Sequence, residues 1–306
     1  MPRSRIRIAV PPDFSFASTV RSHGWSALPP FEADPARSSL GVAFTLPGGE
    51  AVRVSVREAG GGLEAAVDAF RAPGPAGRRA VLATVRSCFR MDEDLAAFHR
   101  LMRRQPEHRW IAQQRAGRML RSPSAFEDAV KMICTTNCTW ELTTLMVTSL
   151  VGLYGAPAPG GARTFPAPEA LAAAGEGALR REARTGYRAP YIAAFAEAVA
   201  AGRVEPEGWR TWRGDTASLF RSMCAVKGIG PYAAGNLLKL AGRYEHLGLD
   251  TWVRGQYARL HHGGRRVSDR TIERAYASYG DWRGLVFWLA MTREWYGAKF
   301  RARRPS

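Results

Sequence analysis

Residues 219–257 read LFRSMCAVKGIGPYAAGNLLKLAGRYEHLGLDTWVRGQY, and this stretch organises the chain around it. Apolar residues recur at helical spacing on both sides of a short glycine-containing turn, which predicts a helix, a tight hairpin and a second helix. Gly228 and Gly230 bracket the turn, where backbone freedom is needed, and Pro231 stands at the first position of the second helix. After a short loop, Asp250 precedes a third helix as an N-cap would.

The predicted hairpin has the properties of a phosphate-binding turn. Its tip consists of Lys227, Gly228, Ile229 and Gly230. Glycines let the backbone approach a phosphate closely, and the free N–H groups at the start of the following helix favour an anion. A Gly-X-Gly turn by itself is also common as a purely structural turn. An aspartate twenty residues after Gly230 makes the combination much more specific.

The string from Val226 to Ala234, followed by Asp250, resembles the helix-hairpin-helix motif of the HhH-GPD superfamily of DNA glycosylases. The order of the other segments resembles the 3-methyladenine DNA glycosylase II and 8-oxoguanine glycosylase branches, and the likeness extends over most of the chain. Residues 11–16 resemble the opening of the N-terminal sheet domain in that family, and residues 126–133 resemble the helix before its lesion-side loop. The resemblance implies that Asp250 is catalytic.

The resemblance implies roles for further positions. Asn137 is similar to the asparagine that fills the gap left by the flipped base in the 8-oxoguanine branch. Tyr232 stands where members with lyase activity have a lysine, which implies a glycosylase without AP-lyase activity. Leu142 stands near the place of the basic residue that reads the opposite cytosine in the 8-oxoguanine branch, which argues against a strict specificity of that kind.

Two tryptophans are also expected to line the base pocket or to fill the gap left by the flipped base, together with Tyr232 and Asn137. Trp140 and Trp252 lie close in sequence to Asn137 and Asp250, and aromatic faces hold a base that has left the stack. The alternative for each tryptophan is the hydrophobic core, where most of the nine in this chain must lie. The alternative for Asn137 is a buried, hydrogen-bonded amide.

The carboxylate of Asp250 suits cleavage of an N-glycosidic bond. Breaking this bond builds positive charge on the sugar, which a nearby carboxylate stabilises, and the same group can orient the attacking water. The alternative is an ordinary helix cap, worth about 1 kcal/mol. No obvious acid is placed to protonate a neutral leaving base, because Glu141 would point about 100° away from Trp140 on a helix. Since a tryptophan face attracts a cation, the sequence favours alkylated purines over 8-oxoguanine.

Composition indicates a polyanionic partner. The 306 residues carry a formal net charge of +17, from 44 basic and 27 acidic residues. Nucleic acid or an anionic membrane surface would match this balance. No apolar run is long enough to span a membrane, and no strongly basic amphipathic helix stands out. We therefore expect double-stranded DNA containing a damaged base as the partner, no membrane association and a monomer.

The N-terminus is basic but lacks the apolar core of a signal peptide, so we expect a cytoplasmic protein, nucleoid-associated if bacterial. No cofactor and no certain metal ligand are predicted. Cys134 and Cys138 lie four apart on one apparent helix, but no second pair completes a tetrahedral site. The resemblance implies one option, a monovalent cation that the hairpin carbonyls of Lys227 and Ile229 hold against phosphate.

We predict an α+β fold in two domains. A small antiparallel sheet domain occupies residues 1–88, and a mainly α-helical HhH-GPD glycosylase domain occupies residues 89–306. Alternating residues and a glycine turn predict strands and a β-hairpin in the first domain. The strand candidates are residues 5–10, 40–46, 51–56 and 79–85, with residues 63–70 ambiguous.

The function that we predict is monofunctional, hydrolytic excision of a damaged, most readily alkylated, purine from duplex DNA in base excision repair. The first alternative is a glycosylase for 8-oxoguanine or a bulkier modified base. The second is a non-catalytic helix-hairpin-helix DNA-binding protein. Asp250 argues against that second alternative, because a carboxylate beside DNA repels phosphate and serves a binding module no purpose.

Overall fold

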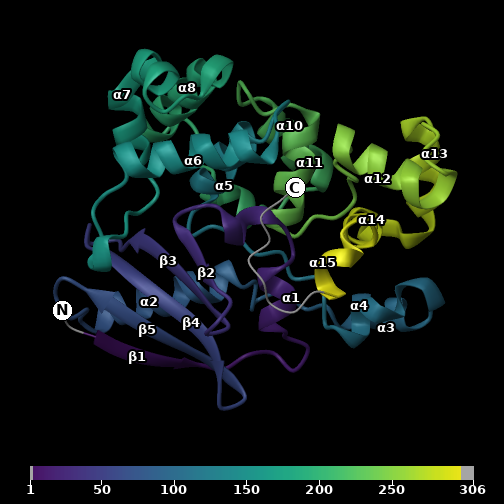
Figure 1. Cartoon of the computed structure of the whole chain (residues 1–306), viewed down its shortest axis with the longest axis horizontal. Helices are drawn as coiled ribbons and strands as arrows, with labels where there is room; N and C mark the ends of the chain where they lie inside the picture. Colours follow the sequence, from purple (N-terminus) through teal and green to yellow (C-terminus); the bar gives the residue numbers. More distant parts are fainter. Residues whose placement is uncertain (1–2, 298–306) are drawn as a thin grey trace.

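A computed structural model describes residues 3–297 and confirms the α+β fold class (Figure 1). A five-stranded sheet lies at one end of the molecule, and helices form the rest of it. Every strand pairs antiparallel with its neighbours, in the order β1-β5-β4-β3-β2. The strands are β1 (Arg3–Ile8), β2 (Phe31–Asp34), β3 (Ser39–Thr45), β4 (Ala51–Ala59) and β5 (Gly62–Ala69).

The register of the sheet puts the apolar residues of its central strands on one face. Val54 of β4 lies opposite Val67 of β5, and both side chains are buried. The other face carries ion pairs, of which Arg3 with Asp68 at 2.8 Å is one. The expected hairpin is confirmed as β3 and β4, and the ambiguous segment after it forms β5.

The prediction of a strand at residues 79–85 is wrong. These residues lie within helix α2 (Pro75–Cys88), which contacts β1. Pro75 stands in the first turn, where a helix does not need the missing N–H. Val81, Val85 and Cys88 are buried at spacings of four and three residues, so they form one helical face toward the sheet. The short apolar run suggested a strand because its helical spacing appears only over the longer segment.

The helices are numbered in chain order, and most of them follow the sheet. Helix α1 (Phe16–Val20) and the short η1 (Gly24–Ala27) precede β2, and all the others follow β5. The longer helices are α3 (Ala96–Arg103), α5 (Ala125–Cys134), α6 (Trp140–Tyr154), α7 (Pro168–Arg181), α8 (Ala189–Ala200), α10 (Thr216–Cys224), α11 (Pro231–Ala241), α12 (Thr251–His262), α13 (Asp269–Tyr276) and α14 (Arg283–Met291). The shorter ones are η2 (Pro106–His108), α4 (Arg109–Gln113), η3 (Pro159–Gly161), η4 (Gly186–Arg188), α9 (Glu207–Arg210), η5 (Ala277–Trp282) and α15 (Arg293–Gly297).

One continuous hydrophobic core joins the sheet and the helices. Hydrogen bonds also connect the segment before β2 to helices that follow the sheet. The indole of Trp25 in η1 donates to the Asp128 carboxylate of α5 at 2.8 Å, and Arg210 of α9 donates to the same carboxylate at 2.7 Å. The indole of Trp288 in α14 donates to the carbonyl of Ser22 at 2.7 Å. The N-terminal segments therefore help to fix the helices around them.

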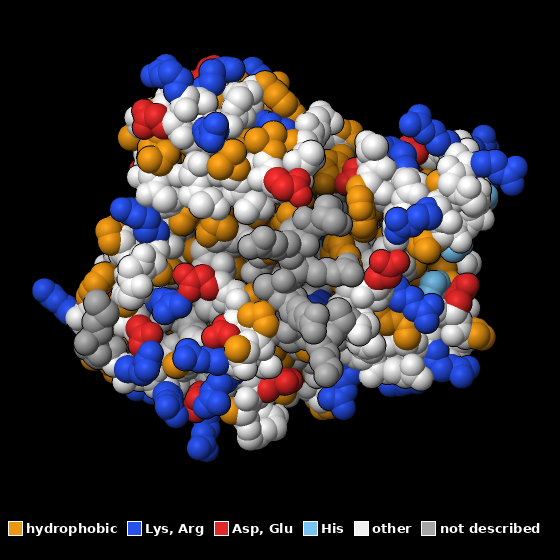
Figure 2. Space-filling view, in the orientation of Figure 1, with side chains coloured by type: hydrophobic (Ala, Val, Ile, Leu, Met, Phe, Trp, Pro, Cys, Tyr) orange, Lys and Arg blue, Asp and Glu red, His pale blue; other side chains and the backbone are white. Residues whose placement is uncertain are grey.

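Arginine and lysine side chains are spread over the face shown in Figure 2, both over the sheet and around α12 and α13, with acidic side chains between them. On the sheet, several arginines are paired with acids: Arg3 with Asp68, Arg53 with Glu32, and Arg57 with Glu64. Within residues 3–297, no helix combines the length and the apolar character that crossing a bilayer would require.

Candidate active site

The predicted hairpin joins α10 to α11. Ile229 is buried and anchors the turn. Its N–H donates to the Val226 carbonyl at 2.9 Å. Gly228 has a φ of 97°, a conformation that favours glycine. Lys227 and Gly230 are exposed. Gly230 is the N-cap of α11, so no cap side chain bonds to the first-turn N–H groups.

Helix α8 supports the hairpin from behind. Tyr191, in its first turn, packs against the face of Gly228. The Tyr191 ring also meets the ring of Tyr187 edge-on, with centroids 6.5 Å apart. Tyr187 is 46% exposed and lies in η4, directly before α8. The start of α8 thus connects the hairpin to a second loop.

That second loop carries Asn137, between α5 and α6. The hydroxyls of Thr135 and Thr136 donate back to carbonyls of the last turn of α5, at 2.7 and 2.8 Å, where the helix ends. Asn137 follows with a φ of 46° and an exposed side chain. Its place at an exposed loop tip differs from that of a buried amide.

Two side chains from η4 hold this loop. The Tyr187 hydroxyl donates to the Thr136 carbonyl at 3.1 Å, and the Arg188 guanidinium donates to the same oxygen. Arg188 is buried, and its guanidinium lies 4.4 Å from the centroid of the Tyr187 ring. These contacts fix the backbone next to Asn137 while its side chain stays in solvent.

Asp250 caps helix α12 and faces the start of α11. Its Oδ1 accepts a hydrogen bond from the Val253 N–H at 2.7 Å. Burial raises the pKa of the Tyr232 hydroxyl, and the charge of the nearby Asp250 carboxylate raises it further, whereas a hydrogen bond to Thr135 acts in the opposite direction. Tyr232 therefore links the end of α5, just before Asn137, to the predicted catalytic carboxylate.

Residues 130–279 match the sequence model of the family described as HhH-GPD superfamily base excision DNA repair protein. Residues 130–279 belong to the HhH-GPD superfamily. The matched segment contains the Asn137 loop, the hairpin and Asp250, which are the parts that the contacts above bring together.

Solved structures show the same fold over nearly the whole chain. The 3-methyladenine DNA glycosylase from Archaeoglobus fulgidus is 20% identical and matches with a TM-score of 0.72, covering 97% of this chain and 99% of that one. MBOgg1, solved in complex with a low-affinity DNA ligand, is 19% identical with a TM-score of 0.68, covering 95% and 96%.

The Clostridium acetobutylicum 8-oxoguanine glycosylase/lyase, solved with double-stranded DNA containing cytosine opposite 8-oxoguanine, is 16% identical, with a TM-score of 0.63 and coverage of 82% and 86%. No curated protein matches the sequence. At these identities, the structural likenesses establish the fold that this HhH-GPD chain shares with both branches.

The two tryptophans of the predicted pocket lie in different surroundings in the HhH-GPD fold. The outer edge of the Trp140 ring packs onto Gly24 of η1. Trp252, in the first turn of α12, is 46% exposed and lies beside two further indoles. The centroid of its ring is 6.3 Å from that of Trp288 and 5.8 Å from that of Trp295. This cluster makes an aromatic surface two residues beyond Asp250.

The expectation that Cys134 and Cys138 share one helix is wrong. Cys134 is the last residue of α5, and Cys138 lies in the loop beyond it, where its thiol donates to the Cys134 carbonyl at 3.1 Å. The helix ends between them because the threonine hydroxyls take up its final carbonyls. Within residues 3–297, no cluster of three or more His, Cys, Asp or Glu side chains could hold a metal ion. The cation at the hairpin carbonyls stays a prediction.

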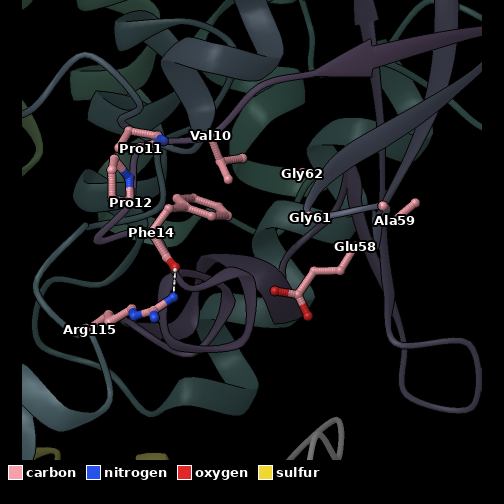
Figure 3. A pocket seen from close by; sticks show the side chains of 10 residues that line it. Val10, Pro11, Pro12, Phe14, Glu58, Ala59, Gly61, Gly62 and Arg115 are labelled. Atoms are coloured by element: carbon pink, nitrogen blue, oxygen red, sulfur yellow. Dashed lines mark hydrogen bonds between the residues drawn. The ribbon is translucent and has the colours of Figure 1, made fainter.

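Two cavities lie away from the Asp250 carboxylate. The one in Figure 3 measures about 480 Å³ and lies at the β4–β5 turn, where Glu58 and Arg115 contribute to its lining. The other measures about 690 Å³ and lies between α8, α9 and α10, with Trp209 and Trp212 in its wall. It includes Lys227 of the hairpin and no other residue of the predicted site.

Sequence reasoning missed the residues that contact the predicted site from other segments, namely Thr135, Tyr187, Arg188 and Tyr191. It also missed Lys239, which is buried in α11. The Tyr187 and Arg188 bonds span 51 and 52 residues, so no local pattern reveals them. Lys239 did leave a signal. It is one of four lysines in the chain, and it interrupts an apolar run in the second helix of the motif.

Proposed function

We propose that this HhH-GPD protein is a DNA glycosylase that binds duplex DNA and hydrolyses the N-glycosidic bond of a damaged purine. The observation that carries the proposal is the arrangement of Asp250 and Tyr232. The hairpin that would bind the DNA backbone opens α11, whose first turn carries Tyr232 close enough to Asp250 for the carboxylate to raise the pKa of the Tyr232 hydroxyl. A DNA-binding turn and a carboxylate suited to stabilise a cationic sugar are thereby joined by one helix.

The hairpin is the proposed phosphate contact. Its exposed tip presents backbone N–H groups at the positive end of an eleven-residue helix, with Lys227 beside them. The exposed face of the sheet is a weaker candidate, because arginines there are already paired with acids such as Asp68 and Glu64. We therefore place the DNA on the hairpin side.

Asn137 is the proposed gap-filling residue. A base reached by this site must leave the stack, and an inserted side chain then supports the duplex. The loop that carries Asn137 is held by Arg188 and Tyr187, so the exposed amide could enter the duplex without first ordering its backbone. The half-exposed Tyr187 ring adds a face on which a neighbouring base could stack.

Alkylated purines are the proposed substrates, because the site offers a cation-attracting aromatic surface. Trp252 lies two residues from Asp250 and is backed by Trp288 and Trp295. A purine alkylated at N3 or N7 carries positive charge and leaves without needing to be protonated. An 8-oxoguanine glycosylase is the second candidate, favoured by the fold shared with the Clostridium acetobutylicum enzyme.

The proposed enzyme has no AP-lyase activity, since a lyase needs an amine to form a Schiff base with the sugar. Tyr232 occupies the position facing Asp250 and cannot form one. Lys239 is fully buried, with its amine bonded to three oxygens, so it does not reach a substrate. Borohydride trapping of a covalent complex would contradict this part and would point to the exposed Lys227.

A panel of duplexes that each carry one defined lesion tests the proposal. We expect 7-methylguanine or 3-methyladenine to be released faster than 8-oxoguanine from matched duplexes, leaving an abasic site in an intact strand. Release of 8-oxoguanine alone would move the protein to the second candidate. Tight duplex binding without release of any lesion would leave a binding protein.

A further inference from the structure

Lys239 is a buried lysine in the third turn of α11. It is 1% exposed and is one of the largest fully buried side chains of the described chain. Its ammonium donates to the Leu247 carbonyl at 2.8 Å, to the Asn236 side-chain oxygen at 3.2 Å and to the Gly235 carbonyl at 3.3 Å. A lysine ammonium has three N–H donors, so the charged form is fully bonded.

The three bonds connect the two sides of the proposed active site. Leu247 belongs to the segment that leads from α11 into Asp250. Asn236, which accepts from Lys239, donates through its amide nitrogen to the Tyr232 carbonyl at 3.0 Å. The ammonium therefore joins the helix turn that carries Tyr232 to the backbone that carries Asp250.

The backbone is shaped to admit this ammonium. Gly248 has a φ of 65°, and a Cβ built on it would lie 2.6 Å from Nζ of Lys239. A Cβ on Gly235 would lie 3.0 Å from the Gly248 Cα, so the segment crosses α11 where both residues are glycines. Any other residue at position 248 would displace the ammonium.

The charge of Lys239 is matched by Asp250. Burial lowers the pKa of Lys239 to about 7, and the attraction of the Asp250 carboxylate opposes this change. The same segment also carries Arg243, Tyr244, Glu245 and His246. Burial lowers the pKa of His246, the positive charges of Arg283 and Lys239 lower it further, and the carboxylates of Glu245 and Glu273 oppose the change. Lys239 therefore changes charge near neutral pH, and its neutral form has one N–H fewer to donate.

We propose that Lys239 is a positioning residue for base release: its ammonium ties the Leu247–Asp250 segment to α11 and holds the Asp250 carboxylate in place beside Tyr232. The inference rests on the proposed function for its rate measurement but not for its structural one. Loss of the ammonium would let the carboxylate shift, and misplacement of a catalytic group by about 1 Å can cost about 10²-fold in rate.

The first test is the pH dependence of single-turnover release of 7-methylguanine from a duplex. For the unaltered protein, we expect the rate to fall on the alkaline side of about pH 7, where Lys239 loses its proton. Binding of the same duplex should not show this fall. An alkaline fall with the same midpoint in Lys239→Gln would overturn the inference, because it would come from another group.

The second test compares two buried lysines. Lys239→Gln should reduce the release rate by about 10–100-fold, change duplex affinity by less than about threefold and remove the alkaline fall. Lys131→Gln is the matched control, because Lys131 is also fully buried and bonds to Glu127 at 2.6 Å, in α5. An equal loss in both variants, or a normal rate and pH profile in Lys239→Gln, would overturn the inference.

The third test does not depend on activity. The Val253 N–H donates to Asp250, and its hydrogen exchange should be faster in Lys239→Gln than in the unaltered protein. In the unaltered protein, exchange of this amide should also accelerate above about pH 7 by more than the intrinsic effect of pH. The Ser218 N–H, which donates to Asp215 at 2.6 Å, should not respond. If no lesion is released but Val253 responds, the proposed function fails and the tie remains. If bases are released but neither the exchange of Val253 nor the release rate changes in Lys239→Gln, only the proposed role of Lys239 fails.

Discussion

Tyr191 and Gly228 fit together because residue 228 has no side chain. A Cβ built on Gly228 would lie 2.6 Å from the Tyr191 Cβ, closer than real contacts allow. Gly230, two residues later, has nothing within 4 Å of the same constructed atom. The two glycines of the hairpin therefore serve different purposes: Gly228 joins the turn to α8, and Gly230 keeps its outer surface open.

Gly228→Ala should damage the hairpin, whereas Gly230→Ala should be tolerated structurally. The first variant meets Tyr191 and adopts a positive φ at a cost of about 1–3 kcal/mol, so we expect lower stability and weaker binding of damaged and undamaged duplexes alike. Urea unfolding and fluorescence anisotropy would measure both. If Gly230→Ala loses as much stability as Gly228→Ala, the assigned roles are wrong.

Gly230→Asp tests the outer surface of the turn. A carboxylate there would face phosphate, so affinity for any duplex should fall while stability remains. Binding should also weaken steeply with added salt, because contacts to phosphate release counterions. An effect on lesion-containing DNA alone would place the turn in the base pocket instead.

Asp250→Asn should keep the fold and lose base release. Asparagine caps a helix as well as aspartate and can still accept from the Val253 N–H, but it cannot stabilise a cationic sugar. We expect the single-turnover rate to fall by about 10²–10⁴-fold and duplex affinity to stay equal or rise. Asp215→Asn, a change at the matching cap of α10, is the control and should leave the rate unchanged. Near-normal excision by Asp250→Asn would remove this carboxylate from the mechanism.

Trp252→Ala should reduce the preference for cationic bases. The attraction of a tryptophan face for a cation is worth about 0.5–2 kcal/mol, so the ratio of 7-methylguanine to 8-oxoguanine release should fall by about 2–30-fold. Leu260→Ala, which removes another exposed apolar side chain from the same helix, should leave the ratio intact. An unchanged ratio in Trp252→Ala would assign lesion choice to other residues.

Acid should destabilise the protein through His23. This histidine is buried. Its Nε2 lies 2.5 Å from the Leu120 carbonyl oxygen, and its Nδ1 accepts a hydrogen bond from the Trp25 N–H. Burial lowers its pKa to about 4, with the charge of Asp128 opposing and that of Lys131 adding to the shift.

Because the folded-state pKa of His23 lies below its unfolded value, the unfolded chain binds the proton more tightly. Stability should therefore fall as pH decreases from about 6.5 to about 4, by up to about 3 kcal/mol from this group. Urea unfolding across this range should give a flatter profile for His23→Phe than for the unaltered chain. The profile should stay steep in His261→Gln, which changes an exposed histidine. Parallel profiles for His23→Phe and the unaltered chain would exclude His23 as the origin.

The hairpin could be predicted because the residues that form it are contiguous. The glycines, Pro231 and the cap at Asp250 each impose a local conformation, and the structure has the turn and both helices where the sequence predicts them. The helix α2 was misread because its apolar spacing is clear only over the full segment that begins at Pro75.

The supports of the site could not be predicted, since they are long-range contacts. The pairing of Arg188 with the Asn137 loop depends on how α8 is placed against α5, which no local spacing encodes. The contact of Tyr191 with Gly228 depends on the same packing. The sequence thus identifies groups suited to chemistry, and the tertiary structure identifies what holds them.

The contact between Trp140 and Gly24 has a consequence for the evolution of this protein. Trp140 begins α6, three residues after Asn137, and a Cβ at position 24 would come within 2.1 Å of its ring. Recombination that exchanged the N-terminal sheet for an unrelated one would leave the hairpin and Asp250 intact but uncover this indole beside the Asn137 loop. The two parts of the chain should therefore be inherited together. Substitutions at positions 24 and 140 should be correlated among related sequences.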